Sequence, residues 1–72
     1  MKVGDEVKYI SGIVGKIVVH YSKVLSIDPD QGIIELENAM KLRFLHKSTD
    51  GGIWNTYRNM ANGKNVLIDD NN

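Results

Sequence analysis

Apolar residues alternate with polar residues on both sides of a turn-forming segment. Before the turn, apolar residues occupy odd positions, namely Ile13, Ile17, Val19, Tyr21, Leu25 and Ile27. After the turn they occupy even positions, namely Ile34, Leu36, Met40, Leu42 and Phe44. A period of two is the pattern of a strand with one buried face. The two runs therefore predict a β-hairpin whose apolar positions point into a core.

The segment between the two runs, residues 28–32, has a turn residue at each place where a turn needs one. Asp28 has a side chain that accepts hydrogen bonds from the backbone ahead of it, and Pro29 fixes φ at the first corner. Gly32 adopts the left-handed conformation that returns a chain to a strand. We expect a tight reversal at this place.

Further strands are predicted on either side of this hairpin. The first spans roughly Asp5 to Ile10, and the last is a short strand at Val66–Ile68. Gly15 indicates a bend or bulge in the long apolar run before the turn. Asn38-Ala39 interrupts the apolar alternation after the turn. Residues 33–46 therefore form either two strands joined by a short reversal or one strongly bent strand.

The period changes near residues 53–61. Its apolar positions are spaced as on a helix, and they are Ile53, Trp54, Tyr57, Met60 and Ala61. We expect a short helical turn here. The alternative is a hairpin at Asn62-Gly63, a strong turn signal, which would pair Tyr57 with Ile68 and Asn59 with Val66.

These elements predict a mainly β fold, a small antiparallel barrel of about five strands with one short helical turn near residues 53–61. The 72 residues form one domain over residues 1–69, followed by a frayed tail at 70–72. The chain has no cysteine and no apolar run long enough to cross a bilayer. We expect a cytoplasmic protein that does not interact with membranes. Self-association through an edge strand is a further possibility, because so small a core supplies little stability.

Three segments in the first half resemble a known family. They are Gly4-Asp5-x-Val7 with Ile10-Ser11-Gly12, then Gly15-Lys16-Ile17, then the segment 23–28. They are similar to the KOW-type modules of ribosomal and transcription-elongation proteins, with Val18–Ser22 as an insertion. The resemblance implies an SH3-like barrel that contacts RNA or the transcription–translation machinery.

Charge is segregated along a chain whose net charge is zero. Residues 41–64 carry five basic residues and one acidic residue. With two aromatic residues, the bases form a candidate nucleic-acid-binding cluster, which consists of Lys41, Arg43, Lys47, Trp54, Tyr57, Arg58 and Lys64. Basic residues contact phosphates and aromatic rings stack on bases. The competing interpretation is that the aromatic residues belong to the core and the bases to an ordinary solvated face.

Residues 28–37 have the opposite character, with four carboxylates and no base. The acidic residues are Asp28, Asp30, Glu35 and Glu37. They define an alternative function, in which the hairpin or an open sheet edge binds a protein. The protein would then be an adaptor or inhibitor of the kind that phages and mobile elements encode as short free-standing proteins. Reversing the charge of one cluster or the other would distinguish the two functions.

No set of residues indicates catalysis or a bound cofactor. The alternation predicts that His20 faces outward and His46 faces inward. The two histidines are not spaced as metal ligands are and have no cysteine beside them, so we expect no metal site. The sequence therefore predicts a non-catalytic binding or regulatory module. Its first expected partner is nucleic acid or a nucleoprotein, and the alternative partner is a protein.

Overall fold

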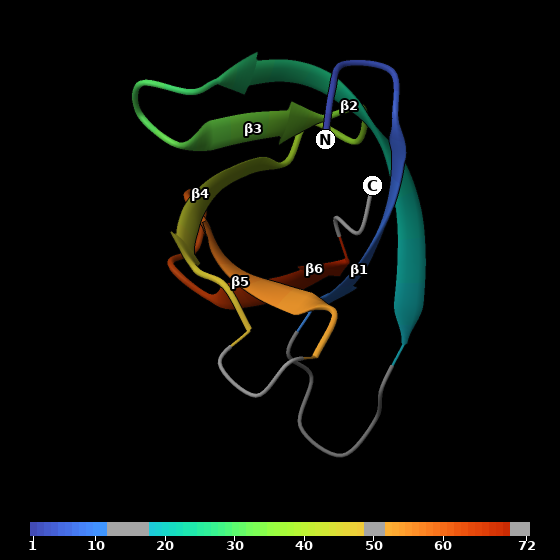
Figure 1. Ribbon diagram of the computed structural model, residues 1–72, viewed down its shortest axis with the longest axis vertical. Coiled ribbons are helices and arrows are strands. Elements are labelled where there is room, and N and C mark those ends of the chain that lie inside the picture. Colours follow the sequence, from blue (N-terminus) through green and yellow to red (C-terminus); the bar gives the residue numbers. More distant parts are fainter. Residues whose placement is uncertain (12–17, 49–51, 70–72) are drawn as a thin grey trace.

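The computed structural model describes residues 1–11, 18–48 and 52–69, which form six antiparallel strands (Figure 1). The strands are β1 (Glu6–Ser11), β2 (Val19–Asp28), β3 (Ile33–Leu36), β4 (Lys41–His46), β5 (Trp54–Asn59) and β6 (Asn65–Asp69). The prediction of a mainly β, small antiparallel barrel is confirmed. The strand number is six rather than about five, and the described residues contain no helix.

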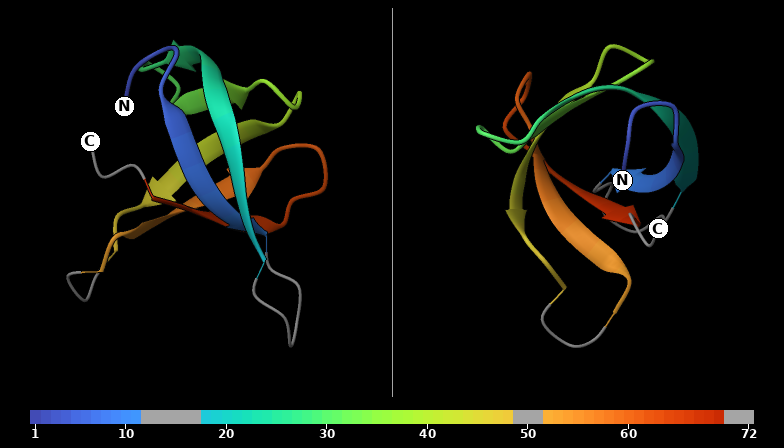
Figure 2. Two further views of the ribbon diagram at one scale, coloured as in Figure 1. Left: turned by 90° about the vertical axis from the view of Figure 1, so that its right-hand side faces the viewer. Right: turned by 45° about the horizontal axis from the view of Figure 1, so that its top comes forward.

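Each strand pairs with the next one in sequence, and β6 returns to pair with β1. Figure 2 shows the β1–β2 pair crossing the β4–β5 pair at a steep angle on the other side of the barrel. Every strand in the described part of the chain therefore has two neighbours. An open sheet edge, proposed above as a binding or self-association site, lacks the unpaired terminal strand that it requires.

Alternate side chains of all six strands fill the interior of the barrel. The buried apolar residues of the described chain are Val7, Tyr9, Val24, Ile34, Leu36, Leu42, Tyr57, Val66 and Ile68. Met1, Ile27 and Met40 pack against them. The predicted inward positions after the turn are therefore confirmed at Ile34, Leu36 and Leu42.

The inward positions predicted before the turn are wrong for most of β2. Ser22 and Val24 are buried, whereas Tyr21 is 60% exposed and Leu25 is 51% exposed. The cause is a β-bulge: Val24 pairs with Leu36 but Ser26 pairs with Glu35, so Leu25 is an extra residue on β2. A bulge reverses the parity of a strand. Odd positions of β2 consequently face outward before the bulge, and Ile27 packs against the core after it. Ile13 and Ile17 lie outside the described residues.

The helical turn predicted near residues 53–61 is also wrong, because Trp54–Asn59 forms β5 between β4 and β6. Only Tyr57 of this segment is buried, so the apolar stripe does not mark one buried face. The asparagines that weaken a helix here instead favour a turn after the strand. The alternative hairpin is present, but Tyr57 pairs with Val66 rather than with Ile68.

The longer loop explains this difference in register. Residues 60–63 form the turn, and the Asn59 backbone N–H donates to the Lys64 carbonyl (2.8 Å). The side-chain oxygen of Asn59 accepts from the Ala61 N–H at 2.9 Å, and Gly63 has a φ of 72°. A two-residue turn at Asn62-Gly63 would have moved the pairing along β6.

The other predicted turns agree with the structure. The Asp28 carboxylate accepts hydrogen bonds from the N–H groups of Asp30 (3.1 Å) and Gln31 (3.3 Å). Gly32 has a φ of 68° and leads into β3. Residues 33–46 are two strands rather than one, and Ala39 in the reversal between them has a φ of 67°. The described residues contain no helix long and apolar enough to span a membrane.

Candidate functional site

Three of the predicted nucleic-acid-binding residues lie together on the outer wall of the barrel. Lys41 and Arg43 are exposed on β4, and Arg58 is exposed on the adjacent β5. Arg43 and Arg58 are directly opposite each other in the antiparallel pairing. Because Lys41 is two residues before Arg43, its side chain is on the same side of the strand. We call these three residues the basic face.

Within the basic face, Lys41 has an acidic neighbour, whereas the two arginines are register partners of each other. Like charges directly opposite each other on neighbouring strands destabilise the pairing. Across residues 1–11, 18–48 and 52–69, no ion pair joins Arg43 or Arg58 to a carboxylate. Glu35 is the acidic residue that pairs by register, and its partner is Lys41. In the part of the chain that the structure describes, the two arginines are thus opposite each other and neither is ion-paired with a carboxylate.

The other four residues of the predicted cluster are separated from one another. Lys64 is exposed in the turn before β6, close to Asn65, which pairs with Arg58. Lys47 is exposed just beyond the end of β4, and Trp54 is half-buried at the far end of β5. Tyr57 is only 5% exposed and belongs to the core. The core interpretation thus holds for Tyr57, while the bases that remain on one wall are Lys41, Arg43 and Arg58.

The acidic residues of the alternative site do not form one surface. Asp28 and Asp30 lie at the turn between β2 and β3, whereas Glu37 lies in the reversal at the other end of β3. The Asp28 carboxylate is also engaged by the backbone of its own turn. Glu35 lies between them on β3, opposite the basic Lys41. The residues are therefore divided between the two ends of a short strand.

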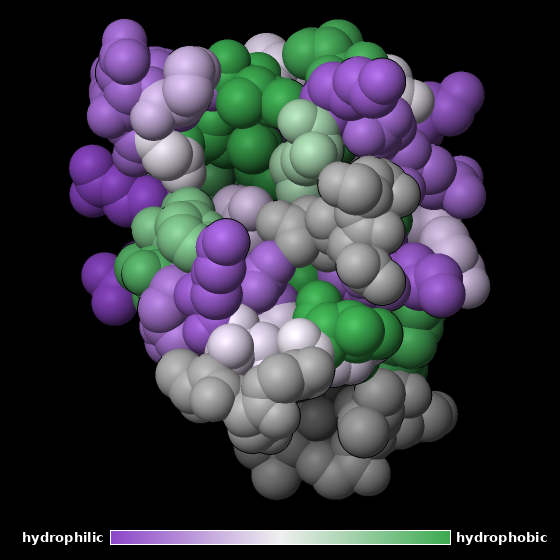
Figure 3. All heavy atoms as spheres, viewed as in Figure 1, coloured by the Kyte–Doolittle hydropathy of each residue, from purple (hydrophilic) through white to green (hydrophobic). Residues whose placement is uncertain are grey.

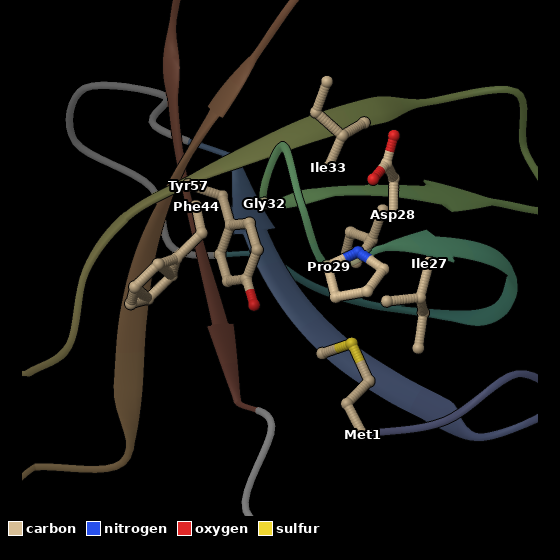
Figure 4. Close-up of a pocket in the computed structure, with 9 residues that line it drawn as sticks. Met1, Ile27, Asp28, Pro29, Gly32, Ile33, Phe44 and Tyr57 are labelled. Carbon is tan, nitrogen blue, oxygen red and sulfur yellow. The ribbon is translucent and has the colours of Figure 1, made fainter.

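An apolar pocket opens at one end of the barrel, between the β2–β3 turn and strands β4 and β5 (Figure 4). Its volume is about 270 Å³. The lining residues are Met1, Ile27, Asp28, Pro29, Gly32, Ile33, Ile34, Phe44 and Tyr57. In the space-filling view the hollow appears as a green area near the top, with hydrophilic residues in purple on both sides (Figure 3).

Contacts between the turn and β4 build one wall of this pocket. The Phe44 N–H donates a 2.8 Å hydrogen bond to the Gly32 carbonyl, so the turn is held against β4. Phe44 also meets Tyr57 edge to face, with ring centroids 5.4 Å apart and an interplanar angle of 69°. Phe44 is 37% exposed, so part of its ring remains open to solvent. The pocket thus offers an accessible aromatic surface in an apolar setting.

The sequence interpretation did not identify this pocket. Its residues come from the N-terminal segment, the β2–β3 turn and strands β2, β3, β4 and β5, and no local motif connects them. Two signals were present in the sequence. Pro29 places one apolar side chain in an otherwise polar turn. Phe44 is two residues after the buried Leu42, so an apolar residue occupies the same side of β4 near the end of the strand, where the barrel opens.

A second, more polar pocket of about 360 Å³ lies beside the first, on the outer side of β3. Asp28, Glu35 and Lys41 line it together with Ser26, Ile27, Gln31, Ile33 and Met60. Within the described chain, no three histidine or acidic side chains are grouped so that they could hold a metal ion. This pocket brings acidic residues and one basic residue into the same shallow depression.

The structure reverses the predicted orientation of both histidines. His20 is half-buried and stacks on the buried Tyr9, with ring centroids 5.0 Å apart. Because His20 lies before the bulge on β2, its side chain is on the inward side of the strand, as are those of Ser22 and Val24. His46 is exposed, because a register shift between Phe44 and His46 displaces the end of β4. The Tyr9 hydroxyl accepts a 2.8 Å hydrogen bond from the Asn38 amide, which completes this polar corner of the core.

No family model, curated protein or solved structure matches this chain.

Proposed function

We propose that this protein is a small non-catalytic module that binds nucleic acid or a nucleoprotein through the basic face. The observation that carries the proposal is the direct opposition of Arg43 and Arg58 on β4 and β5. The proposal includes a cytoplasmic location and a partner in the transcription–translation machinery, as the resemblance to KOW-type modules implies.

The physical argument concerns what would relieve the charge on this wall. Two guanidinium groups opposite each other repel, and a phosphate between them would replace repulsion with two attractive contacts. Arginine suits this role, because its planar group donates paired hydrogen bonds to phosphate oxygens. Lys41 extends the charge along β4. A row of phosphates along a nucleic-acid strand would supply the negative charge that neutralises the basic face.

Binding to a labelled 12-nucleotide strand, measured by fluorescence anisotropy at low salt, tests the proposal. Replacing both arginines (Arg43→Gln with Arg58→Gln) should weaken binding by roughly 100-fold, since each charged hydrogen bond contributes about 1.5 kcal/mol or more. With three phosphate contacts, the logarithm of affinity should fall with the logarithm of salt concentration with a slope of about −2.

The matched control is Lys8→Gln, which removes one exposed positive charge from β1, away from the basic face. Its affinity and its salt slope should equal those of the wild type. The proposal is overturned if the wild type binds no oligonucleotide at 20 mM salt, taken as roughly the low-salt limit. It is also overturned if the double arginine variant binds as tightly as the wild type.

The protein-binding alternative has less support, because Asp30 and Glu37 lie beyond opposite ends of β3 and Glu35 is opposite the basic Lys41. It stays a prediction with its own test, which is the loss of a protein partner in the variant Asp30→Lys with Glu35→Lys. That variant leaves Arg43 and Arg58 unchanged, so the two functions are distinguishable.

A further inference from the structure

We propose that the apolar pocket at the end of the barrel receives one unpaired base of a single-stranded nucleic acid. This inference rests on the proposed function and specifies the form of nucleic acid that the module would take. It assigns a role to Phe44, Ile33 and Pro29, none of which belongs to the basic face.

The chemistry of the pocket suits a base rather than a phosphate. Its walls are aliphatic and aromatic apart from Asp28, whose carboxylate accepts hydrogen bonds from the backbone of its own turn, and no basic side chain lines it. A base has an apolar π-face, and stacking on an aromatic ring is favourable for every base. The exposed part of the Phe44 ring, fixed edge to face against Tyr57, offers such a surface. The Phe44 N–H bond to the Gly32 carbonyl holds both sides of the opening in position.

The size of the pocket indicates a single ring system. Pockets for drug-sized ligands have volumes of roughly 300–1,000 Å³. This pocket, at about 270 Å³, is just below that range. A cavity of this size has room for one base.

The pocket adjoins the basic face at one residue, Ile33. Arg43 and Phe44 are consecutive on β4, so their side chains leave opposite sides of the strand. Ile33 lines the pocket and is the residue that pairs with Arg43 on β3. A phosphate on Arg43 would therefore place the attached nucleotide beside Ile33, at the rim of the pocket. In a duplex, stacking and pairing keep each base away from such a hollow, and only a single strand can supply one at low cost.

The experiment compares three ligands of equal length: a thymine strand, a duplex, and an abasic strand that keeps the sugar and phosphates. The wild type should bind the thymine strand about 5- to 150-fold more tightly than the abasic strand, which is the contribution of one stacked base. The Phe44→Leu variant should lose this preference, and Phe44→Tyr, which keeps a ring, should retain it. Thermal melts establish that both variants fold, and the comparison of ligands on the wild type requires no substitution.

The outcomes separate the two proposals. If the thymine and abasic strands bind equally, and the double arginine variant binds neither, the base pocket is overturned and the basic face stands. A duplex that binds as tightly as the thymine strand likewise overturns the base pocket. If the wild type binds none of the three ligands, both proposals are overturned, and the pocket is open to an apolar side chain of a protein instead.

Discussion

Replacing Arg58 by glutamate should stabilise the fold while it weakens the proposed binding. Arg58 is exposed, lies directly opposite Arg43, and is diagonal to Lys41, the residue two positions before Arg43. A glutamate at this position would face one cation directly and a second diagonally. Its other register partner, Asn65, is neutral.

The magnitude follows from the contribution of one cross-strand pair. A like-charge pair lowers the free energy of unfolding by about 0.2–1 kcal/mol, and an opposite-charge pair raises it by a similar amount. Exchanging one for the other should raise the free energy of unfolding by about 1 kcal/mol. For a domain of this size that corresponds to a rise in melting temperature of about 4–8 °C. Arg58→Gln removes the repulsion without adding an attraction, so about half of the gain is expected.

Urea unfolding at two salt concentrations is the measurement. Raising salt from 0.1 M to 1 M shortens the screening length from about 10 Å to about 3 Å. Relative to Arg58→Gln, high salt should stabilise the wild type, because it weakens the repulsion between the arginines. Relative to the same variant, high salt should destabilise Arg58→Glu, because it weakens the attraction. Equal stability of the three proteins at both salt concentrations would mean that the two guanidinium groups do not interact, and the main support for the basic face would be lost.

Three further substitutions test the core and the turns by urea unfolding. Leu36→Ala, at a fully buried position, should cost about 2–5 kcal/mol, and a cost below about 1 kcal/mol would contradict the burial. Ser22→Ala removes a buried hydroxyl with no hydrogen-bond partner among the described residues, so it should be neutral or stabilising by up to about 1 kcal/mol; a clear loss would reveal a partner for that hydroxyl. Gly32→Ala should cost about 1–2 kcal/mol, because a φ of 68° is unfavourable for alanine, although its Cβ would lie at an ordinary 3.7 Å from the Phe44 Cβ. Gly32→Asn, which tolerates that φ better, should cost less, and the reverse order would show that space rather than φ governs this position.

The sequence predicts those parts of this fold in which local patterns are uninterrupted. Leu36 and Leu42 follow a strict period of two, and Asp28 and Gly32 occupy the places that a tight turn assigns to them. The errors arise where a distant partner changes the pattern. Leu25 is a bulge only because β2 must pair with β3 around a curved wall, and no residue near it announces the change of parity.

The same reasoning applies to the site. Arg43 and Arg58 are both in the predicted cluster, but their direct opposition depends on the register between β4 and β5. Trp54 was grouped with them by its sequence position, and the extended form of β5 moves it to the strand's other end. The apolar pocket was beyond prediction, because it forms only when Met1, the β2–β3 turn and Phe44 come together at one end of the closed barrel.

The pairing of β1 with β6 joins strands that are far apart in the sequence. Tyr9 and Ile68 are neighbours in space although almost the whole chain separates them in sequence. Contacts between such distant residues require the closure of a long loop, and chains that depend on them fold slowly. During synthesis β1 must therefore wait with one side unpaired until β6 has left the ribosome. In that interval the unpaired side of β1 is open to pairing with other chains.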